Sequence, residues 1–327
     1  MKDYTLKYGK GSVTFALDEA HVTELYGTPV PKIDDIRAAL YATLSSPVSH
    51  EPLESWVNPG DKVALIVSDM SRFWMRQDLV VPHIISYLTD KCDVNQNNIT
   101  IIIANGTHPG GDENELRMLV TDGVYDRIRV VNHDCQAKDL VYIGTTSLGT
   151  EVRINPIAAN ADKVIMLGAC TYHVMAGYGG GRKSILPGIS GLETIRQNHL
   201  HSLDLLAPRS NPLIGNGVTD GNPLNEDMCQ AAAMVKNLFG INLVTNADMQ
   251  LAHIISGDPM KSWQLACHRV DEIYRVPIVK KADVIITSCG GYPKDMSLYQ
   301  GTKIIDNVES GLNAGGTLIV LMEAVEG

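Results

Sequence analysis

Residues that could form a site stand at or just after the carboxyl ends of three apolar runs of the sequence. The runs cover residues 62–69, 99–107 and 163–170, and the side chains are Asp69, Met70, Ser71, Arg72, His108 and His173. Ligands of open α/β sheets bind beyond the carboxyl ends of the strands, so these residues are expected to meet at one edge of a sheet. Histidine gains and loses protons near neutral pH. The pattern therefore predicts a site at that edge with His108 and His173 suited to acid–base chemistry.

A glycine-rich stretch between His173 and Gly191 is the most informative segment. Four glycines at positions 177, 179, 180 and 181 precede Lys183 and Ser184. Glycine lets backbone N–H groups approach an anion closely, which favours a phosphate-bearing cofactor or substrate. Two alternatives stay open, a purely structural turn and a nucleoside-triphosphate loop, although Arg182 stands where that loop needs its second glycine. Lys183 can act as a counter-charge or as a covalent anchor.

The ten histidines fall into groups by their neighbours. Most stand in helical or loop contexts that suggest no chemistry, and His133, near the end of the run 127–134, is ambiguous. His199 and His201 lie on a predicted helix that follows the glycine-rich stretch. No H-E-x-x-H motif is present, so the histidines do not predict a zinc site.

Composition excludes several classes of protein. The 327 residues carry a net charge of −10, which argues against a nucleic-acid partner. No run of 18 apolar residues predicts a membrane span, and the first residues show no signal-peptide pattern, so a cytoplasmic protein is expected. The six cysteines form no C-x-x-C pair and are expected to be free buried thiols: Cys92, Cys135, Cys170, Cys229, Cys267 and Cys289.

Apolar runs rich in β-branched residues alternate with helical patterns along the chain. The helical patterns include residues 78–92 and 113–120, and the strand-like runs are 62–69, 99–107, 127–134, 163–170, 241–248, 282–291 and 316–323. Near-continuous apolar strands suit a parallel sheet that helices cover on both faces. The sequence therefore predicts a two-domain α/β fold with a mostly parallel sheet and an active site in the cleft between domains.

The domain boundary is expected near residues 260–278. Residues 1–262 are predicted to form an N-terminal cofactor-binding catalytic domain, and 263–277 a connecting helix. Residues 278–327 would begin a second α/β domain. About 50 residues are few for a domain with its own core, so this second domain is expected to be incomplete.

Several motifs together resemble the nickel-pincer lactate racemases, the LarA family. They extend from the first apolar run to the end of the chain, and the long glycine-rich motif is the most specific of them. The motifs are D-x-[ST]-R at 69–72, G-x-H at 106–108, YH-x-x-AG-x-GGGRK-x-ILPG at 172–188, NH at 198–199, GNP-x-x-EDM at 221–228 and GGYP-x-D-x-x-x-YQ-x-x-K at 290–303.

The resemblance implies a nickel ion held by a pyridinium-3,5-bisthiocarboxylic acid mononucleotide. In the family, a lysine within GGGRK is joined to this nucleotide, and a histidine on the following helix binds the nickel. These roles fall on Lys183 and His199. Mixed sulfur, carbon and nitrogen donors in a square plane suit nickel. The further cofactor contacts that the resemblance implies are Asp69, Met70, Ser71, Arg72, Gly179 and Gly180.

The implied activity is that of an isomerase, a racemase or epimerase of lactate or a related 2-hydroxy acid. Hydride leaves the substrate carbon and returns to the opposite face, while His108 and His173 serve as the two acid–base groups. Arg72, Gln300 and Lys303 are the implied substrate contacts. Proteins that synthesise the cofactor are the implied partners, and a homo-oligomer stays open.

Two departures from the family pattern bear on the substrate. Residues 73–78 lack the proline that commonly follows D-x-[ST]-R, and Pro109 replaces the usual arginine after His108. Trp74 could reshape an apolar pocket and Arg76 could meet a second carboxylate, or the stretch could simply begin a helix. The alternative functions are a phosphotransferase that uses ATP and a non-catalytic module that binds a nucleotide cofactor.

Overall fold

The computed structural model describes residues 1–292 and 294–327, apart from the side chains of residues 299 and 300. The chain divides into two compact units. The larger unit is Pro29–Ile273, and the smaller unit joins Met1–Thr28 to Tyr274–Gly327. Each unit is described separately below.

A six-stranded sheet forms the centre of the larger unit. Its strand order is β12-β11-β8-β3-β4-β5, and only the edge strand β12 runs antiparallel to its neighbour. The strands are β3 (Val63–Ser68), β4 (Ile99–Ala104), β5 (Arg129–Asn132), β8 (Lys163–Ala169), β11 (Leu238–Thr245) and β12 (Leu251–Gly257). All eight residues of β11 are buried, as expected for a strand that is covered on both faces.

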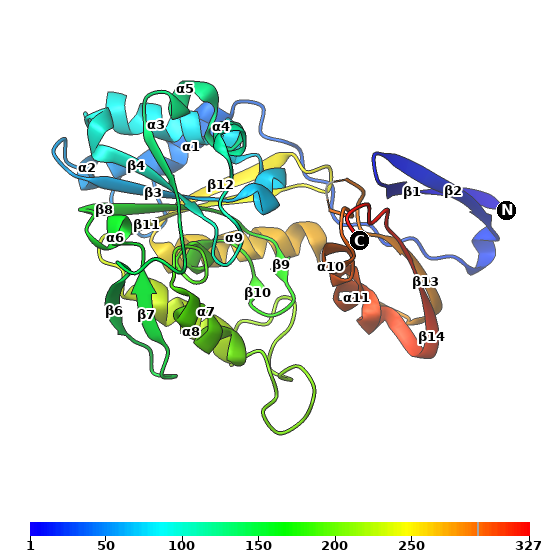
Figure 1. Cartoon of the computed structure of the whole chain (residues 1–327). Helices are drawn as coiled ribbons and strands as arrows, with labels where there is room; N and C mark the ends of the chain where they lie inside the picture. Colours follow the sequence, from blue (N-terminus) through cyan, green and yellow to red (C-terminus); the bar gives the residue numbers. More distant parts are fainter. Residues whose placement is uncertain (293) are drawn as a thin grey trace. The chain divides into compact units, whose positions relative to one another are not determined.

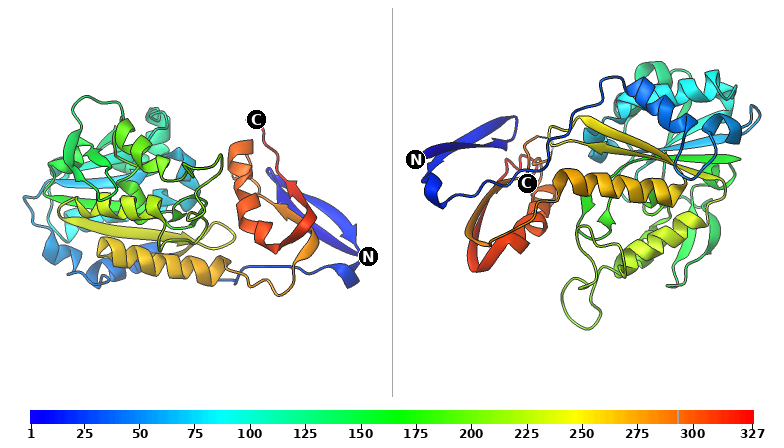
Figure 2. Two further views of the ribbon diagram at one scale, coloured as in Figure 1. Left: turned by 90° about the horizontal axis from the view of Figure 1, so that it is seen from below. Right: turned by 180° about the vertical axis from the view of Figure 1, so that it is seen from behind.

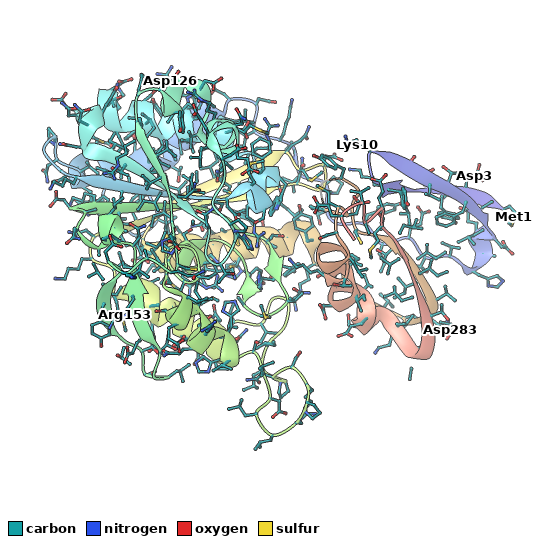
Figure 3. All side chains as sticks on the ribbon, in the orientation of Figure 1. Met1, Asp3, Lys10, Asp126, Arg153 and Asp283 are labelled. Atoms are coloured by element: carbon teal, nitrogen blue, oxygen red, sulfur yellow. The ribbon has the colours of Figure 1, made fainter. Side chains whose placement is uncertain are left out.

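Helices cover both faces of this sheet (Figure 1). One layer contains α1 (Ile36–Ser45), α2 (Leu53–Trp56), α3 (Val81–Asp90), α4 (Glu113–Val120) and α5 (Asp122–Tyr125). The other contains α6 (Pro156–Ala159), α7 (Leu192–Leu200), α8 (Pro223–Ala233) and α9 (Pro259–Tyr274). Two separate apolar cores result, one on each face. Figure 3 labels Asp126 and Arg153, which lie on opposite sides of the sheet.

Two short hairpins accompany the second layer. One pairs β6 (Val141–Thr145) with β7 (Glu151–Ile154), and the other pairs β9 (Tyr172–His173) with β10 (Gly177–Tyr178). Helix α9 runs beside the sheet (Figure 2) and buries Trp263, Ala266, Cys267, Val270 and Ile273. The helix expected as a connector over 263–277 is therefore part of the larger unit's core.

The smaller unit contains two pairs of strands. An antiparallel hairpin joins β1 (Lys2–Tyr8) to β2 (Gly11–Leu17), and a parallel pair joins β13 (Ala282–Ser288) to β14 (Leu312–Leu321). The helices α10 (Leu298–Gly301) and α11 (Lys303–Val308) lie between β13 and β14 in the sequence. Residues 1–28, which include this hairpin and which the sequence analysis placed in the N-terminal domain, group with the C-terminal segment. The predicted domain functions stay predictions.

The predicted α/β class, with a mostly parallel sheet and helices on both faces, is confirmed. All six cysteines are free thiols, as predicted, although Cys229 and Cys289 are only partly buried. Within residues 1–292 and 294–327, no helix has the length and apolar character that crossing a bilayer requires.

Candidate active site

The three strands whose ends carry the predicted site residues are neighbours in the sheet. β3 lies between β8 and β4, and all three are parallel. Their carboxyl ends therefore lie at the same edge of the sheet, which is where the sequence analysis expected a site. Asp69 follows β3, His108 follows β4, and His173 follows β8 within the hairpin β9–β10.

Asp69 and His108 form a hydrogen-bonded pair. Nδ1 of His108 lies 2.5 Å from Oδ2 of Asp69, and the Ser71 hydroxyl donates to Oδ1 of the same carboxylate at 2.6 Å. Burial alone would raise the pKa of Asp69, but the hydrogen bonds from His108 and Ser71 and the charge of Arg72 lower it below its usual value. A carboxylate can only accept, so Nδ1 of His108 carries a proton, and the lone pair of the neutral ring is on Nε2.

His173 meets N–H groups at both of its ring nitrogens. Its Nδ1 accepts backbone N–H groups from Met175 at 3.3 Å and Ala176 at 3.2 Å. Nε2 of the same ring faces the Lys183 side chain, whose ammonium group can only donate. That Nε2 lies 3.3 Å from Nζ of Lys183. The structure thus brings the predicted acid–base residue and the predicted anchor lysine together.

His199 lies half-buried in the last turn of α7. Its Nδ1–H donates to the carbonyl of Ile195 at 2.9 Å, which leaves the lone pair on Nε2. Burial lowers the pKa of His199, and the positive charge of Lys183 lowers it further. A neutral imidazole with an oriented lone pair is the form that binds a metal ion.

The glycines of the loop are required by its packing. A Cβ atom on Gly179 or Gly180 would come within 2.9 or 3.0 Å of the Ala169 carbonyl oxygen, at the end of β8. A Cβ atom on Gly181 would lie 2.7 Å from the ring of Trp263. The amide of Gly179 donates to Thr171 and that of Gly181 to Asn242, so these two N–H groups already have protein acceptors. Gly179 and Gly180 as cofactor contacts stay predictions.

Arg182 holds the glycine-rich loop in place, a role that the sequence analysis missed. Its side chain is fully buried and donates to Asn225 and to the carbonyls of Ala176, Tyr178 and Gly180. Its guanidinium carbon lies 3.7 Å from the ring centroid of Trp263. Each backbone carbonyl that it satisfies belongs to the stretch 176–180, so Arg182 fixes the path of the chain between His173 and Lys183.

The geometry does not support a nucleoside-triphosphate loop. Residues Gly181–Ser184 form a single 3-10 turn, and the next α-helix begins only at Leu192. A P-loop needs its lysine and hydroxyl residue at the start of a helix.

The remaining predicted contacts lie in different places. Met70 is half-buried on the 3-10 helix Met70–Met75, and Nη1 of Arg72 donates to the carbonyl and hydroxyl of Ser71. Arg76 binds Asp78 through two hydrogen bonds, of 3.0 and 2.9 Å, which satisfies the guanidinium that could have met a second carboxylate. Lys303 begins α11 in the smaller unit. The side chain of Gln300 lies outside the described part of the structure.

His133 proves to be structural. It is buried, its Nε2 donates to the Ser190 carbonyl at 2.9 Å, and its Nδ1 accepts from Asn155 at 3.3 Å. Burial lowers the pKa of His133, which keeps the ring neutral. Among the described side chains, no three histidine, cysteine, aspartate or glutamate groups converge on one point as a metal cluster would.

Comparisons with known proteins identify the family. A family model described as the lactate racemase N-terminal domain matches residues 8–209, and one described as the lactate racemase C-terminal domain matches residues 278–327. The chain belongs to the lactate racemase family. The predicted family and the predicted isomerase class are confirmed.

Individual relatives agree with this family. A lactate racemase from Thermoanaerobacterium thermosaccharolyticum is 29% identical over all of this chain and 76% of its own length. A lactate racemase from Lactiplantibacillus plantarum is 28% identical over 98% of this chain and 75% of its own. The solved apoprotein of the Thermoanaerobacterium thermosaccharolyticum enzyme covers all of this chain and 75% of its own, with a TM-score of 0.89 and 28% identity.

Proposed function

We propose that this protein interconverts the two enantiomers of lactate. The family and the names of the relatives support the reaction. The observation that carries it in this chain is that His108, paired with Asp69, and His173, in contact with Lys183, follow parallel strands of one sheet. A neutral His108 with its proton on Nδ1 offers a lone pair at Nε2, and His173 is held through its Nδ1 by the Met175 and Ala176 amides.

These two histidines can serve both directions of an inversion. A 2-hydroxy acid passes through a planar 2-keto acid when the hydrogen on C2 and the hydroxyl proton are removed. In one direction a neutral His108 accepts the hydroxyl proton, and a protonated His173 returns a proton to the keto oxygen, which leaves His173 neutral. Reversal exchanges these tasks between the two side chains. Asp69 stabilises the imidazolium that forms on His108, as a buried carboxylate does in a catalytic triad.

The site residues fit the nickel-pincer nucleotide that the resemblance implies. The fit rests on His199, whose Nε2 lone pair is free of its own helix, and on Lys183, whose charge acts on the same imidazole. Lys183 would anchor the nucleotide and His199 would bind the nickel, with Asp69, Met70, Ser71 and Arg72 beside it. When bound, that group supplies an acceptor for the hydrogen on C2 together with its electron pair. The protein's own groups move only the hydroxyl proton.

The substrate carboxylate needs a cationic partner. Arg72 lies three residues after Asp69 in the sequence, and its guanidinium can bind a carboxylate through two hydrogen bonds. We propose Arg72 as this partner, with Gln300 and Lys303 as the further substrate contacts. The cofactor-synthesising proteins that the resemblance implies are proposed as partners, and the cytoplasm as the location.

The test uses chain that is produced together with those cofactor-forming proteins. L-lactate is added, and D-lactate is measured by chiral chromatography. His108→Ala and His173→Ala are each expected to lower the rate about 10²–10⁴-fold while the protein retains nickel. Normal turnover in either variant would remove that histidine from the proposed role. Retention of the cofactor by the wild-type chain without turnover would favour the non-catalytic binding module instead.

A further inference from the structure

Two tyrosines of the His173 hairpin donate to one carboxylate oxygen. The hydroxyl groups of Tyr172 and Tyr178 lie 2.7 and 2.6 Å from Oδ1 of Asp271. Tyr172 and Tyr178 face each other across the hairpin β9–β10, and their ring centroids lie 5.4 Å apart. Asp271 comes from α9, almost 100 residues further along the chain. Neither the acid–base chemistry nor the cofactor contacts account for this convergence.

The position of this carboxylate is informative. Residues 174–176 form the turn of the hairpin, and the side chain of Asn222 holds that turn by donating to the Met175 carbonyl at 2.8 Å. Tyr172 and Tyr178 stand at the opposite, open end. Asp271 therefore closes the end of the hairpin that Asn222 does not reach. His173 lies between these two fixed ends, directly after Tyr172.

A second contact ties the same helix to the glycine-rich loop. Nε1 of Trp263 donates to the Gly179 carbonyl at 2.9 Å, and the Trp263 ring carries the guanidinium of Arg182. Trp263 and Asp271 both belong to α9. The helix thus holds both segments that flank the His173–Lys183 contact.

We propose that Asp271, acting through Tyr172 and Tyr178, is a positioning residue that sets the orientation of His173 for the proposed racemisation. The catalytic part of this inference rests on the proposed function. The mechanism is geometric. Oδ1 of Asp271 fixes both phenols, the phenols fix the hairpin register, and the register presents the Met175 and Ala176 amides to Nδ1 of His173. Loss of the carboxylate oxygen loosens the His173 ring without removing any group that touches substrate.

The main test compares Asp271→Ala with Asp271→Asn, because asparagine keeps an oxygen that can accept both phenols. Asp271→Ala is expected to lower kcat about tenfold or more with KM changed less than about twofold, since small misplacements of catalytic groups are costly. Asp271→Asn is expected to stay within about threefold of wild type. Glu272→Ala is the matched control, because this neighbouring carboxylate is exposed and pairs with Arg269 instead.

A second readout uses the protein without cofactor. Hydrogen exchange of the Met175 and Ala176 amides is expected to accelerate about tenfold or more in Asp271→Ala and to stay slow in Asp271→Asn and Glu272→Ala. If Asp271→Ala does not fold, Tyr172→Phe replaces it, because that change removes one hydroxyl and keeps the ring. In Tyr172→Phe, kcat is then expected to fall and amide exchange to accelerate, as in Asp271→Ala.

Two results would overturn the proposal. One is slow amide exchange and unchanged kcat in Asp271→Ala, and the other is an Asp271→Asn variant as impaired as the alanine variant. If the wild-type chain shows no turnover at all, the proposed function fails. The amide-exchange comparison then decides by itself whether Asp271 positions His173.

Discussion

The Asp69–His108 pair yields the sharpest prediction, through the variant Asp69→Asn. The Ser71 hydroxyl donates to Oδ1 of Asp69, so the oxygen of an asparagine is expected to stay with Ser71. Its amide nitrogen would then face Nδ1 of His108, at the place of Oδ2. An amide N–H donates, so Nδ1 would become the acceptor and the ring proton would move to Nε2. His108 would lose the lone pair with which it accepts the substrate proton.

The size of the effect follows from the bond that is lost. A hydrogen bond to a charged group contributes about 1.5–3 kcal/mol. Asp69 is only 8% exposed, but the His108 side chain is 53% exposed, so water screens part of the interaction. The lower half of that range corresponds to a loss of kcat of about tenfold to fiftyfold. The assay is racemisation of lactate by cofactor-loaded protein, with bound nickel measured in parallel.

A second substitution separates the orientation of the residue 69 side chain from the loss of its charge. In Asp69→Asn combined with Ser71→Ala, nothing holds the amide oxygen away from His108, so the side chain can turn and accept from Nδ1. The double variant is therefore expected to be faster than Asp69→Asn alone. A wild-type rate for Asp69→Asn, or a double variant slower than the single one, would refute the reasoning.

Acid stability gives an independent readout in the protein without cofactor. The pKa of Asp69 is lowered from its ordinary value of 3.8 in the folded protein. A lowered folded pKa adds stability that is present above the ordinary value and is lost as the pH falls through the folded value. The stability difference between wild type and Asp69→Asn should therefore shrink as the pH falls below about 3.8. A difference that stays constant across that range would contradict the pairing.

Three further predictions concern the glycine-rich loop. Lys183→Ala should abolish any covalent adduct seen by intact-mass measurement. Lys236→Ala, which changes an exposed lysine, should keep the adduct. An adduct that persists in Lys183→Ala would rule out Lys183 as the anchor. Arg182→Met should lower the free energy of unfolding by about 3 kcal/mol or more in urea titrations, because buried carbonyls lose their donor. Arg196→Met, which changes an exposed arginine, should alter the free energy of unfolding by less than about 0.5 kcal/mol. Gly181→Ala should lower the free energy of unfolding by about 1–3 kcal/mol, because the new Cβ would overlap Trp263 and the backbone has a φ of +50°. Gly123→Ala should not destabilise the protein, because no atom lies within 4 Å of its Cβ.

Much of the sheet could be predicted from the sequence because its strands are buried on both faces. The run 62–69 contains β3, and the run 163–170 contains β8, within one or two residues at each end. The edge strand β12 was missed, because its sequence LAHIISG carries polar and small residues between the apolar ones. The hairpin of β1 and β2 was also missed, since an alternating pattern exposed on one side gives a weaker apolar signal than a buried strand.

The position of the candidate residues at one edge of the sheet was predictable from the sequence, but their contacts were not. Strand ends placed His108 and His173 at one edge of the sheet, as the structure shows. The partner of each histidine depends on loop conformation, so the 39-residue separation of Asp69 and His108 gave no signal. Arg182 is an ordinary basic residue in the sequence, and its complete burial depends on Asn225 and Trp263, which lie far away in the chain.

The most direct test of the proposed reaction follows the hydrogen on C2. L-lactate is converted by the cofactor-loaded chain in heavy water, and deuterium at C2 of the D-lactate formed is measured by mass spectrometry and NMR. If the histidines move only the hydroxyl proton, the product carries no deuterium at C2 above natural abundance. Deuterium at C2 of the inverted product would show that this hydrogen leaves as a proton, and would contradict the roles given to His108 and His173.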